Sequence, residues 1–170
     1  SIAALFGVLA CGVAHAATAD IEAFYKGKTV EFIIGYATGG SNDTYSRMIA
    51  QHMGKHIPGN PTVIAQSMPG AGSFTAANFL FARAPKDGTQ IGIVTQSLAI
   101  EEMLKTPGVN YKAAEFNWIG RATSNVEITV VSSNAKAKTV EDAKTIETVL
   151  AATGSGSAGE GYPKMLNGTI

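Results

Sequence analysis

Two short glycine-rich loops, each lying between a strand-like and a helix-like segment, constrain the fold of this chain more than any other feature. Five of the six residues at positions 29–34 are β-branched or aromatic, and a glycine follows them, which predicts a strand. After the loop 37–42, side chains recur at helical spacing and predict a helix. The positions that share this spacing are Tyr45, Met48, Ile49, His52 and Met53. Asn42 or Asp43 can cap this helix, and the glycine after Met53 can end it.

The same order of segments repeats further along the chain. The expected elements are a strand at 62–66, a glycine loop at 69–72, a helix at 74–83, a turn at Asp87-Gly88 and a strand at 90–95. Strands that alternate with helices in this way are typical of an α/β fold, in which right-handed crossovers connect a parallel sheet. A hydrophobic fraction of 45% is enough to build a packed core.

The composition changes after Leu104, and we expect a second α/β unit to follow. Its elements would be a strand at 127–131, a helix with the capping-box pattern Thr139-x-x-Asp142, an apolar run at 148–152, a glycine loop at 154–157 and a helix after Gly159. The chain then divides into segments 1–16, 17–105 and 106–170. Because a sheet this short leaves an edge and a face uncovered, we expect further elements beyond Ile170, so that the fold is incomplete at the C-terminus.

An uncharged apolar run from Ile2 to Val13 lies at the start and is shorter than the roughly 20 residues that span a membrane. It leads to Ala14-His15-Ala16, the small-x-small pattern that signal peptidase cleaves. Residues 1–16 are therefore expected to be an export signal, clipped at its start, with a mature chain from Ala17. The single cysteine, Cys11, lies within this segment, so the mature protein would contain none.

Charge and residue types argue against several functions. Thirteen Lys and Arg balance thirteen Asp and Glu, whereas nucleic-acid binders usually carry a basic excess. No catalytic set or metal-ligand spacing stands out, so we expect no enzyme, no cofactor and no metal, with His52 and His56 at a helix surface. One alternative stays open, because Gly154 to Gly159 spell G-x-G-x-x-G. That motif would suit a dinucleotide-binding enzyme if an acidic residue followed about 20 residues later.

The two glycine loops are the best candidates for a binding site, since both would lie at the carboxyl ends of strands, where open α/β sheets bind ligands. Backbone N–H groups and two helix N-termini would attract an anion there without a positively charged side chain. Arg47 and Arg83 would matter less, because they follow the loops on the helices. The glycines involved are Gly39, Gly40, Gly70 and Gly72, and the polar neighbours are Thr38, Ser41, Asn42, Ser67 and Ser73. The simpler alternative is that these glycines only permit tight turns, and a side chain would be strained wherever φ is positive.

Several motifs, in one order along the chain, resemble landmarks of the tripartite tricarboxylate transporter receptors, the TctC or Bug family. In the first part they are Phe24-Tyr25-Lys26-Gly27-Lys28, the segment from Gly35 to Asp43, Pro58-Gly59-Asn60-Pro61, the segment from Met68 to Ser73, and the segment from Ala84 to Thr89. In the second part they are Ile119-Gly120-Arg121, the segment from Ala152 to Ser157, and the segment from Tyr162 to Asn167. The sequence departs from the common pattern at Tyr36, Ser67 and Met68, where many members have Phe, Asn and Arg.

The resemblance implies a periplasmic receptor with the two-lobed, periplasmic-binding-protein-like flytrap fold, with lobe 1 at 17–105 and the start of lobe 2 at 106–170. It implies a monomer that binds a carboxylated small metabolite and serves the membrane subunits of a tripartite tricarboxylate-type transporter. The matching first-lobe site residues are Ala37, Thr38, Gly39, Gly40, Asn42, Asp43, Gly70, Ala71, Gly72, Thr95 and Gln96. The matching second-lobe residues are Ser155, Gly156, Ser157 and Ala158.

Overall fold

Three parallel strands form the centre of the structure: β1 (Thr29–Ile34), β2 (Thr62–Ser67) and β3 (Gln90–Ile93). They lie in the order β2-β1-β3, with Thr29 opposite Thr62 and Glu31 opposite Gln90. This computed structural model describes residues 19–122, 124, 128–151 and 158–169. The predicted α/β class and its parallel sheet are confirmed, and each strand expected in the first unit is present.

The strand β1 lies in the middle because it is the most apolar of the three. Val30, Phe32, Ile33 and Ile34 are all buried. Successive side chains of a strand point to opposite faces, so Phe32 and Ile34 lie on one face and Ile33 on the other. Both faces of the sheet must therefore be covered, as is usual for parallel sheets.

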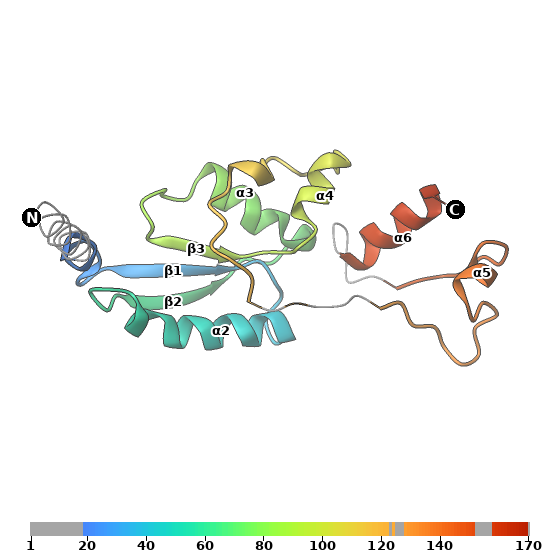
Figure 1. Cartoon of the computed structure of the whole chain (residues 1–170), viewed down its shortest axis with the longest axis horizontal. Helices are drawn as coiled ribbons and strands as arrows, with labels where there is room; N and C mark the ends of the chain where they lie inside the picture. Colours follow the sequence, from blue (N-terminus) through green and yellow to red (C-terminus); the bar gives the residue numbers. More distant parts are fainter. Residues whose placement is uncertain (1–18, 123, 125–127, 152–157, 170) are drawn as a thin grey trace, which may run out of the picture.

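Helices cover both faces (Figure 1). α2 (Ser41–Met53) packs against β1 and β2 on one face. α3 (Phe74–Ala82) and α4 (Leu98–Met103) lie on the opposite face. Residues 19–25 are also helical, and three short 3₁₀ turns complete the unit: η1 (Gly54–His56), η2 (Ala71–Ser73) and η3 (Ala113–Glu115).

The face of α2 that packs on the sheet includes only some of the positions that recur at helical spacing. Its buried or half-buried side chains are Asp43, Ser46, Ile49, Ala50 and Met53. Tyr45 and Met48, two of the positions that recur at helical spacing, are more than half exposed. Ser46 can be buried because its hydroxyl donates to the Asn42 carbonyl oxygen at 2.5 Å, which satisfies its polar group. Periodicity correctly predicted the helix, but the apolar positions alone did not identify its buried face.

An apolar cluster lies on the face of the sheet that α3 covers. Its members are Phe74, Ala77, Leu98 and Tyr111, with Phe81, Val94, Val109 and Phe116 packed against them. The Tyr111 hydroxyl donates to the Leu98 carbonyl oxygen at 3.1 Å. Burial, followed by the nearby negative charges of Glu101 and Glu102, raises the pKa of Tyr111 to about 12. The hydroxyl therefore keeps its proton and remains a hydrogen-bond donor at neutral pH.

We expect Tyr111→Phe to lower the free energy of unfolding by about 0.5–1.5 kcal/mol, because it removes the donor that satisfies a buried carbonyl. Tyr25→Phe is the matched control, since the Tyr25 hydroxyl donates to the Gly88 carbonyl oxygen at an exposed position. Its effect should be smaller, because water can replace the exposed bond. Urea unfolding of both variants measures the difference, and equal losses would contradict this account of the cluster.

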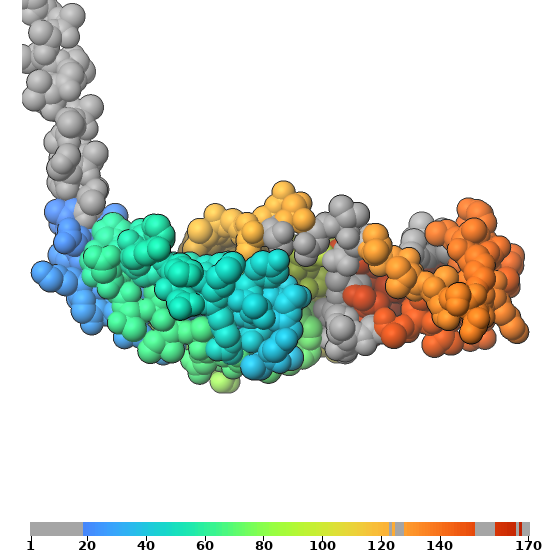
Figure 2. Space-filling view, turned by 90° about the horizontal axis from the view of Figure 1, so that it is seen from below, coloured from blue at the N-terminus to red at the C-terminus, as the bar shows by residue number. Residues whose placement is uncertain are grey.

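From residue 128 onward, the described segments lie beyond the carboxyl ends of the strands (Figure 1). In Figure 2 these segments, coloured orange and red, lie on the opposite side from the blue residues that precede β1. α5 (Val140–Ala143) begins with the predicted capping box. The Asp142 N–H donates to Thr139 Oγ1 at 3.1 Å, and the Thr139 N–H donates to Asp142 Oδ2 at 3.0 Å. α6 (Ala158–Thr169) is the helix expected near Gly159. The helical expectations of the second unit are therefore confirmed.

The strand predicted at 127–131 is wrong for the residues that the structure describes. Positions 128–131 have no regular secondary structure. Positions 148–151, which belong to the apolar run noted at 148–152, have none either. Ile128 and Val130 are 78% and 75% exposed, so they do not form the inward face of a sheet. A strand is stable only when a neighbour pairs with its backbone. None of the described residues from 128 to 169 forms a strand that could do so.

Two expectations concern segments outside the described residues. The proposed export signal at 1–16, with Cys11 and the cleavage site, is one of them, and the motif residues 154–157 are the other. Within the described part of the chain, no helix combines the length and the apolar character that crossing a bilayer requires.

Candidate functional site

Hydrogen bonds join the segments that follow β1 and β2 to each other and to the last residues of β1 and β3, at one edge of the sheet. The Met68 N–H donates to the Ile34 carbonyl oxygen at 2.7 Å, and the Gly35 N–H donates to the Ile93 carbonyl oxygen at 2.9 Å. The buried Ser73 hydroxyl donates to the Gly35 carbonyl oxygen, also at 2.9 Å. Sequence segments that lie far apart in the chain therefore meet at the carboxyl edge of the sheet.

The connections after β1 and β3 leave this edge toward opposite faces, to α2 and α4 respectively (Figure 1). Neighbouring parallel strands with diverging connections form a topological switch point, which is the usual position of ligand sites in open α/β sheets. Tyr36 and Thr95, which follow these two strands, share a side-chain hydrogen bond. Burial raises the pKa of Tyr36, and this bond lowers it in part.

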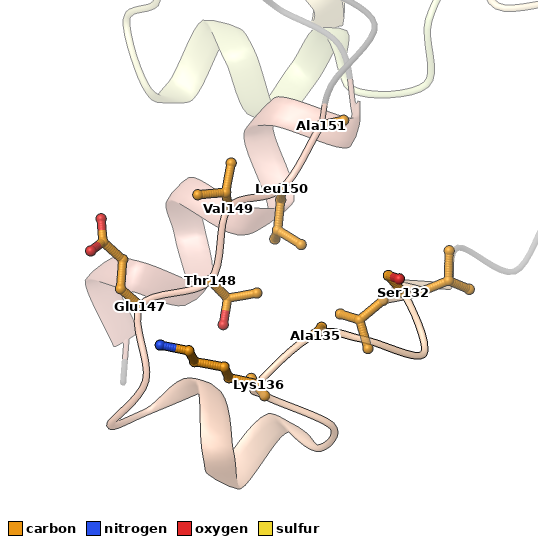
Figure 3. Close-up of a pocket in the computed structure, with 11 residues that line it drawn as sticks. Ser132, Ala135, Lys136, Glu147, Thr148, Val149, Leu150 and Ala151 are labelled. Carbon is orange, nitrogen blue, oxygen red and sulfur yellow. The ribbon is translucent and has the colours of Figure 1, made fainter.

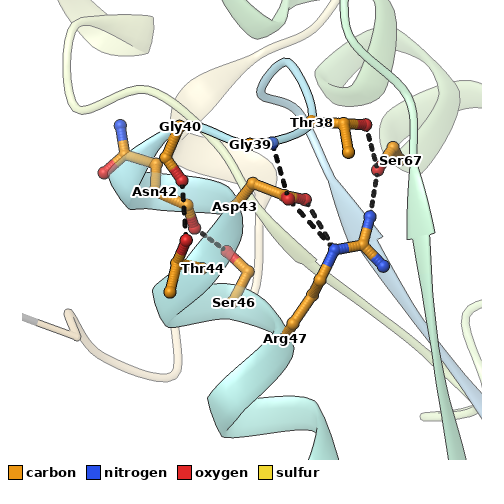
Figure 4. Close-up of polar contacts among 9 residues, drawn as sticks. All are labelled: Thr38, Gly39, Gly40, Asn42, Asp43, Thr44, Ser46, Arg47 and Ser67. Atoms are coloured by element: carbon orange, nitrogen blue, oxygen red, sulfur yellow. Dashed lines mark hydrogen bonds and ion pairs between the residues drawn. The ribbon is translucent and has the colours of Figure 1, made fainter.

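The loop after β1 is held by Asp43, a buried residue in the first turn of α2 (Figure 4). Asp43 Oδ2 accepts the Gly39 N–H at 3.0 Å. Gly40 is the N-cap residue of α2, and no side chain caps it. The prediction that Asn42 or Asp43 occupies the cap position is therefore wrong. Asp43 instead reaches back one residue beyond the cap and fixes the loop.

Arg47 lies at this loop and connects it to the end of β2 (Figure 4). Its Nε atom is 3.0 Å from both carboxylate oxygens of Asp43, and its Nη2 donates to Ser67 Oγ at 2.8 Å. Thr38 Oγ1 donates to the same Ser67 oxygen at 3.4 Å. The Arg47 side chain is 44% exposed, so the guanidinium is also open to solvent.

The expectation that no positively charged side chain lies at these loops is therefore corrected. Arg47 lies on α2, past the first loop as expected, but its side chain reaches Asp43 and Ser67 beside the loop. One turn of helix brings residue 47 back beside residue 43, because side chains four apart share a face. The spacing Asp43-x-x-x-Arg47 is the sequence signal that could have indicated this pair.

The loop after β2 has a rare backbone conformation. Four consecutive residues have positive φ angles: Gly70 at 141°, Ala71 at 43°, Gly72 at 59° and Ser73 at 79°. Ala71 and Ser73 carry side chains, and left-handed conformations cost such residues roughly 1–2 kcal/mol each. Strained backbone of this kind concentrates at functional sites. The glycines of this loop therefore permit a tight turn, but Ala71 and Ser73 also adopt a strained backbone conformation there.

Gly39 and Gly40 differ in what they require of the backbone. Gly39 has a φ of 89° and no atom near the position of a Cβ. Gly40 has a φ of −79°, and a Cβ there would lie 3.7 Å from the nearest atom, the Ala37 carbonyl oxygen. At this φ a side chain at position 40 causes no backbone strain, and the fold has room for it.

The structure places the predicted first-lobe residues along this edge with different exposure. Those exposed are Ala37, Thr38, Gly39, Gly40, Asn42, Gly70, Ala71 and Gln96. Gly72 is half-buried, and Asp43 and Thr95 are buried. Thr95 Oγ1 lies 3.0 Å from Ser97 Oγ within this buried group. The second-lobe candidates Ser155, Gly156 and Ser157 lie outside the described residues, and so does most of the G-x-G-x-x-G motif.

The pKa of Asp43 is held below its ordinary value, chiefly by its hydrogen bond to Arg47 and then by the Gly39 N–H. A carboxyl group whose pKa is lower in the folded state stabilises the fold above the unfolded pKa of about 3.9, and this contribution disappears as pH falls through the folded pKa. We expect Asp43→Asn to reduce the free energy of unfolding by a constant amount above about pH 5 and by less below about pH 4. Urea unfolding at several pH values tests this, and a pH-independent difference would contradict it.

A cavity of about 400 Å³ lies elsewhere, between segments 130–137 and 147–151 (Figure 3). Valine, leucine and alanine side chains form much of its wall, with Lys136 and Glu147 as the charged residues. It contains none of the predicted site residues. Its walls have no regular secondary structure, so it lacks the rigid support that the sheet edge provides.

No family model and no curated protein matches this chain. The geometry of the sheet edge and the motifs in the sequence therefore indicate what the chain binds. Among the described residues, no group of three or more His, Cys, Asp and Glu side chains could hold a metal ion.

Proposed function

We propose that this chain is part of a periplasmic solute-binding receptor that captures a small carboxylated metabolite at the carboxyl edge of its sheet. The observation that carries the proposal is the convergence of loops 37–40, 70–73 and 95–97 at a topological switch point beside Arg47. This is the arrangement in which open α/β sheets hold small ligands. The mixed polar and backbone character of the edge favours binding over catalysis.

The chemistry of the edge suits a carboxylate. α2 has 13 residues, and its N-terminus has no side-chain cap, so its first N–H groups can donate to an anion. Among the described contacts of Arg47, Nε and Nη2 have partners, while Nη1 has none. A carboxylate has two oxygens, which can accept from the loop N–H groups and from the guanidinium at the same time.

The wider assignment follows from the motifs that resemble the tripartite tricarboxylate transporter receptors. We infer a two-lobed flytrap in which residues 17–105 form most of the first lobe and residues from 106 begin the second. The described segments after residue 128 lie on the carboxyl side of the sheet, where a second lobe would close on the ligand. In this proposal Ser155, Gly156 and Ser157 contribute from the second lobe. The protein acts as a monomer in the periplasm and delivers its ligand to the membrane subunits of the transporter.

Thermal unfolding of the purified protein in the presence of a ligand panel tests this proposal. The panel contains citrate, succinate and glutamate, each paired with its methyl ester, together with phosphate and NAD. A bound ligand at a hundredfold excess over its dissociation constant stabilises the fold by about 2.7 kcal/mol. We expect stabilisation by at least one carboxylate and none by its ester. Stabilisation by NAD alone would favour the dinucleotide alternative, and no response to any carboxylate would reject the proposal.

A further inference from the structure

A second region contains a buried charged group that the carboxylate site does not use. Glu101, on α4, is 3% exposed. Its Oε2 accepts the Thr106 hydroxyl at 2.7 Å. Its Oε1 is buried and has no hydrogen-bond partner among the described residues. A buried carboxylate oxygen without a partner is costly, so its surroundings should contain whatever compensates for it.

The group that faces this oxygen is the first turn of α6. A Cβ built on Gly161, the fourth residue of α6, would lie only 2.9 Å from Glu101 Oε1. Gly161 is itself buried, and α4 and α6 are neighbours in Figure 1. Glycine at this position therefore allows the helix backbone to approach the carboxylate closely. Helix N-termini carry a partial positive charge and attract negative groups, and α6 has 12 residues.

We propose that Glu101 is an acidic latch that holds α6 against the first α/β unit. The attraction between the Glu101 carboxylate and the first turn of α6 compensates for the missing hydrogen bond at Oε1. The latch connects two parts of the chain that lie far apart in sequence, because α4 directly follows Thr95 to Ser97 at the carboxyl edge. Release of the latch would free residues 158–169 without disturbing the sheet.

Hydrogen–deuterium exchange of the whole chain, without added ligand, tests the latch in Glu101→Gln. Glutamine retains the shape of the side chain and an acceptor for Thr106 but removes the charge. We expect the amides of 158–169 to exchange about tenfold faster, while those of β1, β2 and β3 remain unchanged. Glu102→Gln is the matched control, because Glu102 Oε2 accepts the Ala113 N–H at 2.7 Å and so supports η3. It should leave α6 unchanged.

Unchanged exchange of α6 in Glu101→Gln would overturn the proposal, as would an equal acceleration in Glu102→Gln. If Glu101→Gln also loses protection in the sheet, Gly161→Ala decides the question. Alanine stabilises a helix interior relative to glycine by up to about 1 kcal/mol, so an undocked α6 would exchange more slowly in this variant. A latched α6 would exchange faster, because the new Cβ meets Glu101 Oε1. The test uses no ligand, so its failure is distinct from failure of the proposed function.

Discussion

Gly70→Ser should destabilise the protein by about 1–3 kcal/mol and weaken carboxylate binding by at least about tenfold. Gly70 has a φ of 141° and a ψ of 140°, a region that only glycine visits readily. A Cβ there would also lie 2.5 Å from Thr75 Oγ1. The loop after β2 must therefore change shape, and its N–H groups would leave the carboxyl edge. Urea unfolding measures the stability, and isothermal titration with the acid that stabilises the protein best measures the affinity.

Gly40→Ser is the matched control and should change stability in the opposite direction. Its φ of −79° suits any residue, and serine is a preferred N-cap that would supply the cap α2 lacks. A gain of a few tenths to about 1 kcal/mol is expected. If both serine variants lose the same stability, the loop conformation at Gly70 is not the cause.

Arg47→Gln should weaken carboxylate binding by about tenfold or more, because the substitution removes the cation at the site. It also leaves the buried Asp43 carboxylate without its ion pair and breaks the bond to Ser67 that joins the first loop to β2. Isothermal titration at two salt concentrations measures the effect. Affinity of the unmodified protein should fall with added salt if the guanidinium contacts the ligand.

Arg83→Gln is the control with the same change of charge. Arg83 is exposed and follows the C-terminal end of α3, which points away from the carboxyl edge because α3 runs back from the end of β2. The affinity of the Arg83→Gln variant for the carboxylate should equal that of the unmodified protein. Equal losses in the two variants would mean that only the net charge matters, and that Arg47 does not belong to the site.

The sequence predicted the first α/β unit well, because its strands and helices carry strong local signals. The strand 29–34 is apolar apart from Thr29 and Glu31, and buried central strands show such apolar runs. Glycines also follow the first two strands, at Gly35 after β1 and at Gly70 after β2. The elements that these local signals predict are present in the structure. The position of the candidate site, at the carboxyl edge of the sheet, could therefore be expected.

Features that depend on contacts between distant segments could not be predicted in the same way. Asp43 is buried, and the Arg47 side chain beside it bonds to Ser67, which lies at the end of β2 and not on α2. The positive φ of Ala71 and Ser73 is imposed by the surrounding structure, since neither residue prefers it. The strand expected at 127–131 was predicted from a local apolar pattern alone, but a strand is stable only when a neighbouring strand pairs with its backbone.

The central claim is that loops 37–40, 70–73 and 95–97 bind one carboxylate together. The most direct test is a titration of ¹⁵N-labelled protein with the acid that stabilises it best, followed through the backbone amide resonances. We predict that Gly39, Gly40, Gly70 and Gln96 shift along one binding curve, while amides around the cavity at 130–137 and 147–151 do not. Shifts confined to the cavity, or shifts of the glycine loops with different affinities, would contradict the account.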